Sequence, residues 1–133
     1  MIRICIVVII IFISCSATKS LLSDCKNNVT ELLKGNWFYV KDSSYYKTNF
    51  RMLEQIKSEY KECIMKWNSH QIIQVFGTPS IIETKSASDQ SPGKLTYDVR
   101  IPGDKTNTKW VFYFHRDNSV WYFGKENDVG TVK

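Results

Sequence analysis

The feature that most constrains the fold is a change in the spacing of apolar residues at Gly77-Thr78-Pro79. Before this tripeptide, apolar residues recur every three or four positions, which predicts amphipathic helices. After it, they alternate with polar residues, which predicts half-buried strands over 80–85, 95–101, 109–115 and 119–124. Helices followed by an antiparallel sheet make an α+β domain. We therefore expect N-terminal helices packed on one face of a three- to four-stranded antiparallel sheet.

Three helices are predicted in the first half of the chain, over 20–34, 49–67 and 68–77. Asn49 and Asn68 stand at the beginning of the second and third, and asparagine is a favoured N-cap residue. Gly77 ends the third helix, and Pro79 prevents its continuation. The apolar segment 36–40 has no clear period, and it is either a short strand or an irregular packed segment.

The last two predicted strands form a hairpin whose register decides which side chains enter the core. A two-residue turn at 117–118 places Phe114 opposite Trp121. The same register places Phe112 opposite Phe123. We assign this apolar face to the core, where it is joined by Trp110, Leu95, Tyr97, Val99 and Ile101.

The opposite face of the sheet is the candidate partner-binding surface. It carries Asp98, Arg100, Val111, Tyr113, His115 and Tyr122, together with Thr96 and Val120. Tyrosine, histidine and arginine set among small apolar groups are typical of protein-binding surfaces. The alternatives are a half-solvated sheet face and a face covered by the chain's own termini. A one-residue change in turn length would exchange the two faces.

The apolar run at residues 4–13 follows a single positive charge at Arg3. Spanning a bilayer as a helix takes roughly 20 apolar residues, so this run is typical of a secretory signal instead. The sequence Phe-Ile-Ser-Cys at 12–15 resembles the bacterial lipobox, in which the cysteine receives the lipid. The resemblance implies lipidation of Cys15, with a signal peptide at 1–14, a tether at 15–19, one domain at 20–124 and a polar tail at 125–133. The alternative is an ordinary signal peptide that is cleaved near Ser16 or Ala17.

Cys25 and Cys63 are the two cysteines that remain once Cys5 leaves with the signal peptide and Cys15 is lipidated. In an exported chain such a pair can persist as a disulfide. Both residues lie on the apolar faces of predicted helices, so a bridge between the helices is reasonable. The alternative is that both are small buried hydrophobic residues. Neither has CxxC spacing or neighbouring histidines, so no metal site is predicted.

The charged residues argue against nucleic acid as a partner. Lys and Arg number 18 and Asp and Glu 13, and removal of Arg3 with the leader leaves 17 against 13, a net charge of +4. These charges are scattered, which indicates a solvated surface with a mild attraction for anionic partners.

The two histidines, His70 and His115, stand in no catalytic motif, and a phosphate-binding glycine loop is absent. We therefore predict no enzyme activity, cofactor or small-molecule substrate.

Asn68, Gly77-Thr78-Pro79 and Phe-His-Arg-Asp-Asn-Ser-Val at 114–120 together resemble the small bacterial lipoproteins of the SmpA/OmlA (BamE) type and the related fold of β-lactamase-inhibitor proteins. The similarity covers 67–124, with Asn118 in place of the family's turn glycine. It implies a non-catalytic, lipid-anchored envelope protein on the periplasmic side of the outer membrane, which binds another protein in outer-membrane assembly or maintenance. The inhibitor branch of the fold implies the alternative, a protein that blocks an enzyme or toxin through its sheet face.

Overall fold

The computed structural model describes residues 24–84 and 92–131, so the leader, Cys15 and the tether lie outside the described residues. The described chain begins in a helix at 24–33. It continues through β1 (Trp37–Val40), β2 (Tyr45–Thr48), α2 (Phe50–Glu59), α3 (Lys61–Ile64), α4 (Ser69–Phe76), β3 (Ile81–Thr84), β4 (Pro92–Arg100), β5 (Thr108–Phe114), β6 (Val120–Lys125) and the 3-10 helix η1 (Glu126–Thr131).

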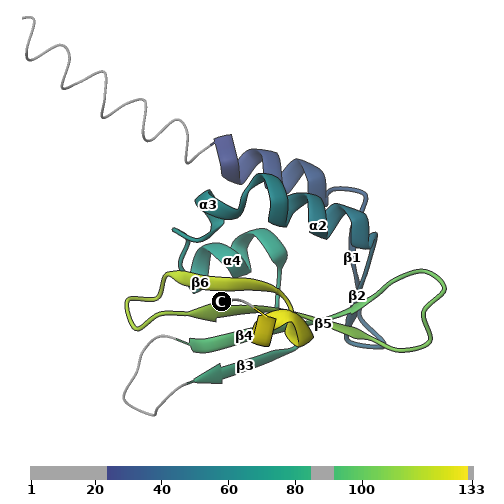
Figure 1. The fold of residues 1–133 in the computed structure, drawn as a ribbon. Coiled ribbons are helices and arrows are strands. Elements are labelled where there is room, and N and C mark those ends of the chain that lie inside the picture. The colour runs from purple at the N-terminus through teal and green to yellow at the C-terminus, as the bar shows by residue number, and fades with distance from the viewer. Residues whose placement is uncertain (1–23, 85–91, 132–133) are drawn as a thin grey trace, which may run out of the picture.

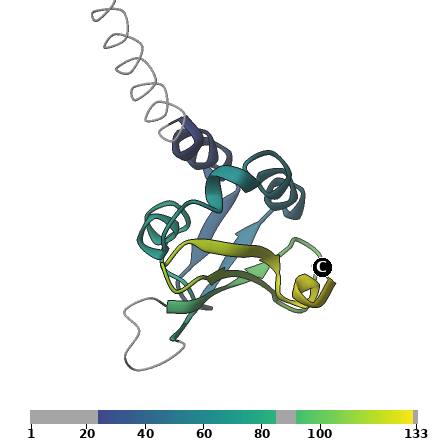
Figure 2. The same cartoon turned by 60° about the vertical axis from the view of Figure 1, so that its left-hand side comes forward.

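One mixed sheet organises the chain, in the order β1-β2-β4-β5-β6, with β3 beside β4. All neighbours are antiparallel except β2 and β4, which are parallel. A parallel pair needs a long crossover connection, and here α2, α3 and α4 provide it. The helices consequently gather on one face of the sheet, and η1 follows β6 on the side away from them (Figures 1 and 2).

The α+β class is confirmed, but the predicted three- to four-stranded antiparallel sheet is wrong in two respects. The described residues form six strands, and the pair of β2 and β4 is parallel. Strand β1 confirms the strand alternative for 36–40, whereas β2 was not predicted, because its sequence Tyr-Tyr-Lys-Thr does not alternate apolar and polar residues. Of β2 only Tyr46 and Thr48 are buried, and β1 is an edge strand with both Phe38 and Tyr39 exposed. The predicted second helix also divides at Tyr60, whose φ of −117° and ψ of 11° separate α2 from α3.

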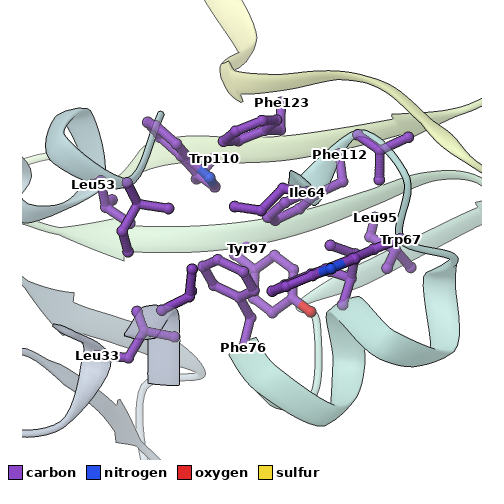
Figure 3. Close-up of a cluster of buried hydrophobic side chains, with 14 of the residues drawn as sticks. Leu33, Leu53, Ile64, Trp67, Phe76, Leu95, Tyr97, Trp110, Phe112 and Phe123 are labelled. Atoms are coloured by element: carbon purple, nitrogen blue, oxygen red, sulfur yellow. The ribbon is translucent and has the colours of Figure 1, made fainter. Parts of the chain in front are cut away.

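The core lies between the helices and the sheet face that the sequence assigned to it. Phe112 stacks on Phe123 with ring centroids 5.6 Å apart, and its other side meets Phe76 of α4 at 5.0 Å. Figure 3 shows these rings together with Trp110, Tyr97, Leu95, Leu53, Ile64 and Trp67. The inward assignment of Leu95, Tyr97, Val99, Trp110, Phe112 and Phe123 is thereby confirmed.

The turn after α4 is held by three aromatic side chains. The carbonyl oxygens of residues 76, 77 and 78 accept hydrogen bonds from the Trp37 indole at 2.7 Å, the Tyr97 hydroxyl at 2.9 Å and the Tyr46 hydroxyl at 2.7 Å. Carbonyls at a helix C-terminus otherwise lack partners. Gly77 is required here because its φ is 86° and a Cβ would lie 2.7 Å from the Tyr46 hydroxyl oxygen. The backbone of the Gly-x-Pro turn is therefore bound directly to aromatic side chains of the core.

Tyr46 makes stability sensitive to alkaline pH. Burial, and secondarily Tyr39, raise the pKa of Tyr46 to about 12 from an ordinary value of 10.0. The folded state retains the Tyr46 proton more strongly than the unfolded state does. The contribution of Tyr46 to the free energy of unfolding is therefore complete below about pH 10 and is lost as pH rises from about 10 to about 12. We expect urea denaturation to show falling stability across this window. The Tyr46→Phe variant should show a shallower fall, and an unchanged slope would contradict the assignment to Tyr46.

The predicted N-caps of the second and third helices are confirmed. Asn49 accepts a hydrogen bond from the Arg51 amide at 2.9 Å. Asn68 and Gln71 form a reciprocal capping box, with both bonds at 2.9 Å.

We expect Asn68→Ala to lower the free energy of unfolding by about 1 kcal/mol, because it leaves a backbone donor of α4 without its partner. Urea denaturation measures this difference. Asn127→Ala, at an exposed position in η1, is the control. Equal effects of the two substitutions would show that the cap does not stabilise α4.

Cys25 and Cys63 lie within bonding distance of each other, with Cα atoms 6.6 Å apart. This separation is within the range of protein disulfides. The pair ties the helix at 24–33 to α3, as the positions of the two cysteines on the helix faces led us to expect.

Candidate protein-binding surface

The turn of the last hairpin differs from the predicted two-residue turn. The Asn118 amide donates to the His115 carbonyl at 3.0 Å, and the His115 amide donates to the Ser119 carbonyl at 2.8 Å. Asn118 has a φ of 68°. These bonds define a three-residue loop at 116–118 that ends in a left-handed residue, a common hairpin connection. Asp117 supports the loop by accepting from the amide of Ser119 at 2.9 Å.

The side chain of Asn118 also connects the loop to α4. Its side-chain oxygen accepts a hydrogen bond from the Ser69 amide at 3.4 Å. Asparagine tolerates the left-handed conformation and, unlike glycine, supplies an acceptor. This bond holds the turn against the beginning of α4. A second bond does the same, because the Val120 amide donates to the Trp67 carbonyl at 3.1 Å.

The longer loop changes the register at the turn, and a β-bulge restores it. Phe114 lies opposite Val120, so the predicted pairing of Phe114 with Trp121 is wrong. A register shift between Tyr113 and Phe114 leaves Trp121 as the extra residue, and beyond it the predicted pairing of Phe112 with Phe123 is confirmed. Val120 therefore enters the core, with 1% of its surface exposed, in place of Trp121.

Trp121 lies instead against two residues that the sequence placed on the outer face of the sheet, the face away from the helices. Its ring centroid is 5.2 Å from that of Tyr113 and 6.5 Å from that of His115. His115 is exposed, and Tyr113 and Trp121 are half-buried. We call Tyr113, His115 and Trp121 the aromatic patch. The sequence missed Trp121; the signal was Asp117-Asn118-Ser119, which suits a three-residue loop.

Polar groups border the aromatic patch toward β3. Glu83, Lys94 and Tyr113 occupy paired positions across three neighbouring strands. The Lys94 ammonium lies 5.5 Å from the centre of the Tyr113 ring and 3.3 Å from a Glu83 carboxylate oxygen. A hollow of about 300 Å³ is lined by these residues with Thr84 and Gly93. The patch thus combines aromatic surface with a charged rim.

The structure divides the other predicted binding residues between two regions. Val111 is fully buried and Tyr122 is 4% exposed, yet neither belongs to the core cluster. Both lie on the outer face, where η1 contacts β5 and β6. The C-terminal segment thus lies against part of this sheet, as one of the alternatives left open by the sequence would have it. Within the predicted polar tail, Lys125 is the last residue of β6, and Glu126–Thr131 form η1.

Asp98 and Arg100 are half-buried near the opposite end of β4, away from the aromatic patch. Arg100 donates its Nε–H to the Asn107 side-chain oxygen at 3.0 Å, and its guanidinium lies 4.2 Å from the centre of the Tyr45 ring. Asp98 is paired in register with Lys109. These contacts join β2, β4 and β5, so the two residues are not brought together with Tyr113 and His115.

Other chemistry is sparse in the part of the chain that the structure describes. There, no three His, Cys, Asp or Glu residues are grouped so that they could hold a metal ion. His70 shares a hydrogen bond with Gln74 at 3.1 Å. A hollow of about 480 Å³ is lined by polar residues from 106–109 and 125–127. No described helix is long and apolar enough to cross a bilayer.

Comparison with protein families, with curated proteins and with solved structures found no match to this chain.

Proposed function

We propose that this chain is a non-catalytic, lipid-anchored envelope protein that binds another protein through the aromatic patch. The observation that carries the proposal is the bulge, which keeps Trp121 out of the core and beside Tyr113 and His115. Tryptophan and tyrosine dominate the binding energy of protein interfaces because they bury large areas with little loss of side-chain freedom. A tryptophan held at the surface by backbone geometry fits such a role.

The envelope location is supported by the Cys25–Cys63 pair and by the N-terminal sequence. A disulfide persists in compartments outside the cytosol. Lipidation of Cys15 would place the domain beside a membrane, on a tether of residues 15–19. The setting that we propose is the periplasmic side of the outer membrane, in its assembly or maintenance.

The test compares Trp121→Ala with Phe38→Ala in full-length chains expressed in the source cells. Phe38 is the matched control because it is an aromatic residue with 53% of its surface exposed, on β1 rather than β5 or β6. After crosslinking and membrane solubilisation, we expect wild type and Phe38→Ala to recover the same partner. Trp121→Ala should lose most of it, since central aromatic anchors contribute about 2 kcal/mol or more.

Three outcomes decide between the readings. Loss of the partner in Trp121→Ala alone supports the proposal. Equal recovery by both variants contradicts the aromatic patch as the binding surface. Recovery of one hydrolase or toxin, inhibited by the wild-type chain, would replace an envelope-assembly role with that of an inhibitor or immunity-type protein.

A further inference from the structure

The outer sheet face holds apolar surface that belongs to neither the core nor the aromatic patch. Val111 and Tyr122 point away from the helices, since their neighbours Phe112 and Phe123 are the core residues of the same strands. Both are nonetheless buried. The elements around them are η1, which contacts β5 and β6, and Lys57 of α2, whose ammonium lies 5.5 Å from the centre of the Tyr122 ring.

Two described contacts hold the start of this segment: the Tyr122 hydroxyl donates to the Lys125 carbonyl at 2.8 Å, and a charged pair follows it. Glu126 of η1 pairs with Lys94, whose side chain is 17% exposed, and Lys94 is shared with Glu83 of β3. The hydrogen bond from Lys94, and secondarily the charges of Lys94 and Lys109, lower the pKa of Glu126 against the opposing effect of burial. η1 itself has six residues in 3-10 geometry, which is a weak helix. A Cβ added at Gly130 would meet no atom within 4 Å, so this residue of η1 borders open space.

We propose that Lys94, Val111 and Tyr122 form a docking surface that η1 of the same chain occupies. The partner of this surface is a short acidic segment of another protein, which displaces η1. The inference rests on the proposed function only in that the chain binds a protein. η1 shows the chemistry that the surface accepts, a carboxylate on Lys94. Three cations from separate elements, Lys57, Lys94 and Lys109, favour an acidic occupant. Glu83 beside Lys94 and Glu54 near Tyr122 are opposing charges that remain when η1 leaves.

Hydroxyl-radical footprinting with mass spectrometry tests whether η1 is the cover. We compare full-length wild type with Glu126→Gln and Glu83→Gln. Both substitutions remove a carboxylate from Lys94, but only Glu126 belongs to η1. Labelling of Tyr122 should rise about threefold or more in Glu126→Gln, because a charge-assisted contact is lost, and should stay near wild type in Glu83→Gln. Tyr97, which is fully buried in the core, is the internal reference and should not change.

Docking in trans is tested with a fluorescent peptide of residues 125–131, Lys-Glu-Asn-Asp-Val-Gly-Thr. The peptide should bind Glu126→Gln about threefold or more tightly than wild type, and adding Lys94→Gln should abolish the gain. The proposal is overturned by unchanged Tyr122 labelling, by equal labelling in Glu83→Gln, by a parallel rise at Tyr97, or by absence of peptide binding. The Trp121 ring lies 6.1 Å from the Tyr122 ring, so the separating variant is His115→Ala. It changes the aromatic patch and should leave peptide binding intact, so failure of the aromatic patch and failure of this surface are distinguishable.

Discussion

Replacing Phe112 by alanine is expected to lower the free energy of unfolding by about 3 to 5 kcal/mol. Phe112 is fully buried between Phe123, stacked at 5.6 Å, and Phe76 at 5.0 Å. Alanine would leave a cavity that strand β5, paired on both sides, cannot close by collapse. Urea denaturation followed by circular dichroism measures the difference.

The adjacent residue is the matched control for this prediction. Tyr113 is half-buried on the outer face, so Tyr113→Ala should cost much less than Phe112→Ala. A larger cost at Tyr113 than at Phe112 would mean that the two faces of β5 are exchanged. That result would contradict both the core and the aromatic patch, because both depend on the same register.

Removing the Cys25–Cys63 pair is expected to have the next largest effect. The cysteines are 38 residues apart in the sequence, and closing a loop of this length stabilises by about 3 to 4 kcal/mol in the chain-entropy description. The Cys25→Ala, Cys63→Ala double variant should therefore unfold at a clearly lower urea concentration than the oxidised wild type. Reduced wild type should resemble the double variant.

The reference for the cysteine variants is the wild-type chain under oxidising conditions, with its free thiols counted. A count of zero among Cys25 and Cys63 is expected before reduction. If reduction changes neither the thiol count nor the urea midpoint, the two residues are unbridged. They would then be small core side chains, and the support that they lend to an envelope location would be lost.

The helix caps and the core pairing could be predicted because their signals lie within a few residues. Asn68 and Gln71 make the capping box three positions apart, and Gly77 ends the same helix. The pairing of Phe112 with Phe123 was predicted correctly although the turn was not, since the longer loop and the bulge at Trp121 compensate. Alternation of apolar residues identified β5 and β6 irrespective of the turn.

The candidate surface was predicted only in part, because its composition depends on the turn and on a distant segment. Tyr113 and His115 were placed on the outer face, where they lie beside Trp121. Arg100 contacts Tyr45 and Asn107, and Asp98 lies opposite Lys109. Their separation from the patch follows from the register of β4 with β5, in which Tyr113 lies opposite Lys94 near the other end of β4.

By itself the sequence determined the α+β class, the capped helices and the inward face of the last strands, since each depends on hydrogen bonds or side-chain spacing between near neighbours. Only the tertiary structure decided the parallel pairing of β2 with β4, the exclusion of Trp121 from the core and the burial of Tyr122 near η1. These features depend on contacts such as Asn118 with Ser69 and Lys94 with Glu126, which join positions 49 and 32 residues apart. Local sequence preferences cannot predict such contacts, because they form only once the sheet and helices have packed.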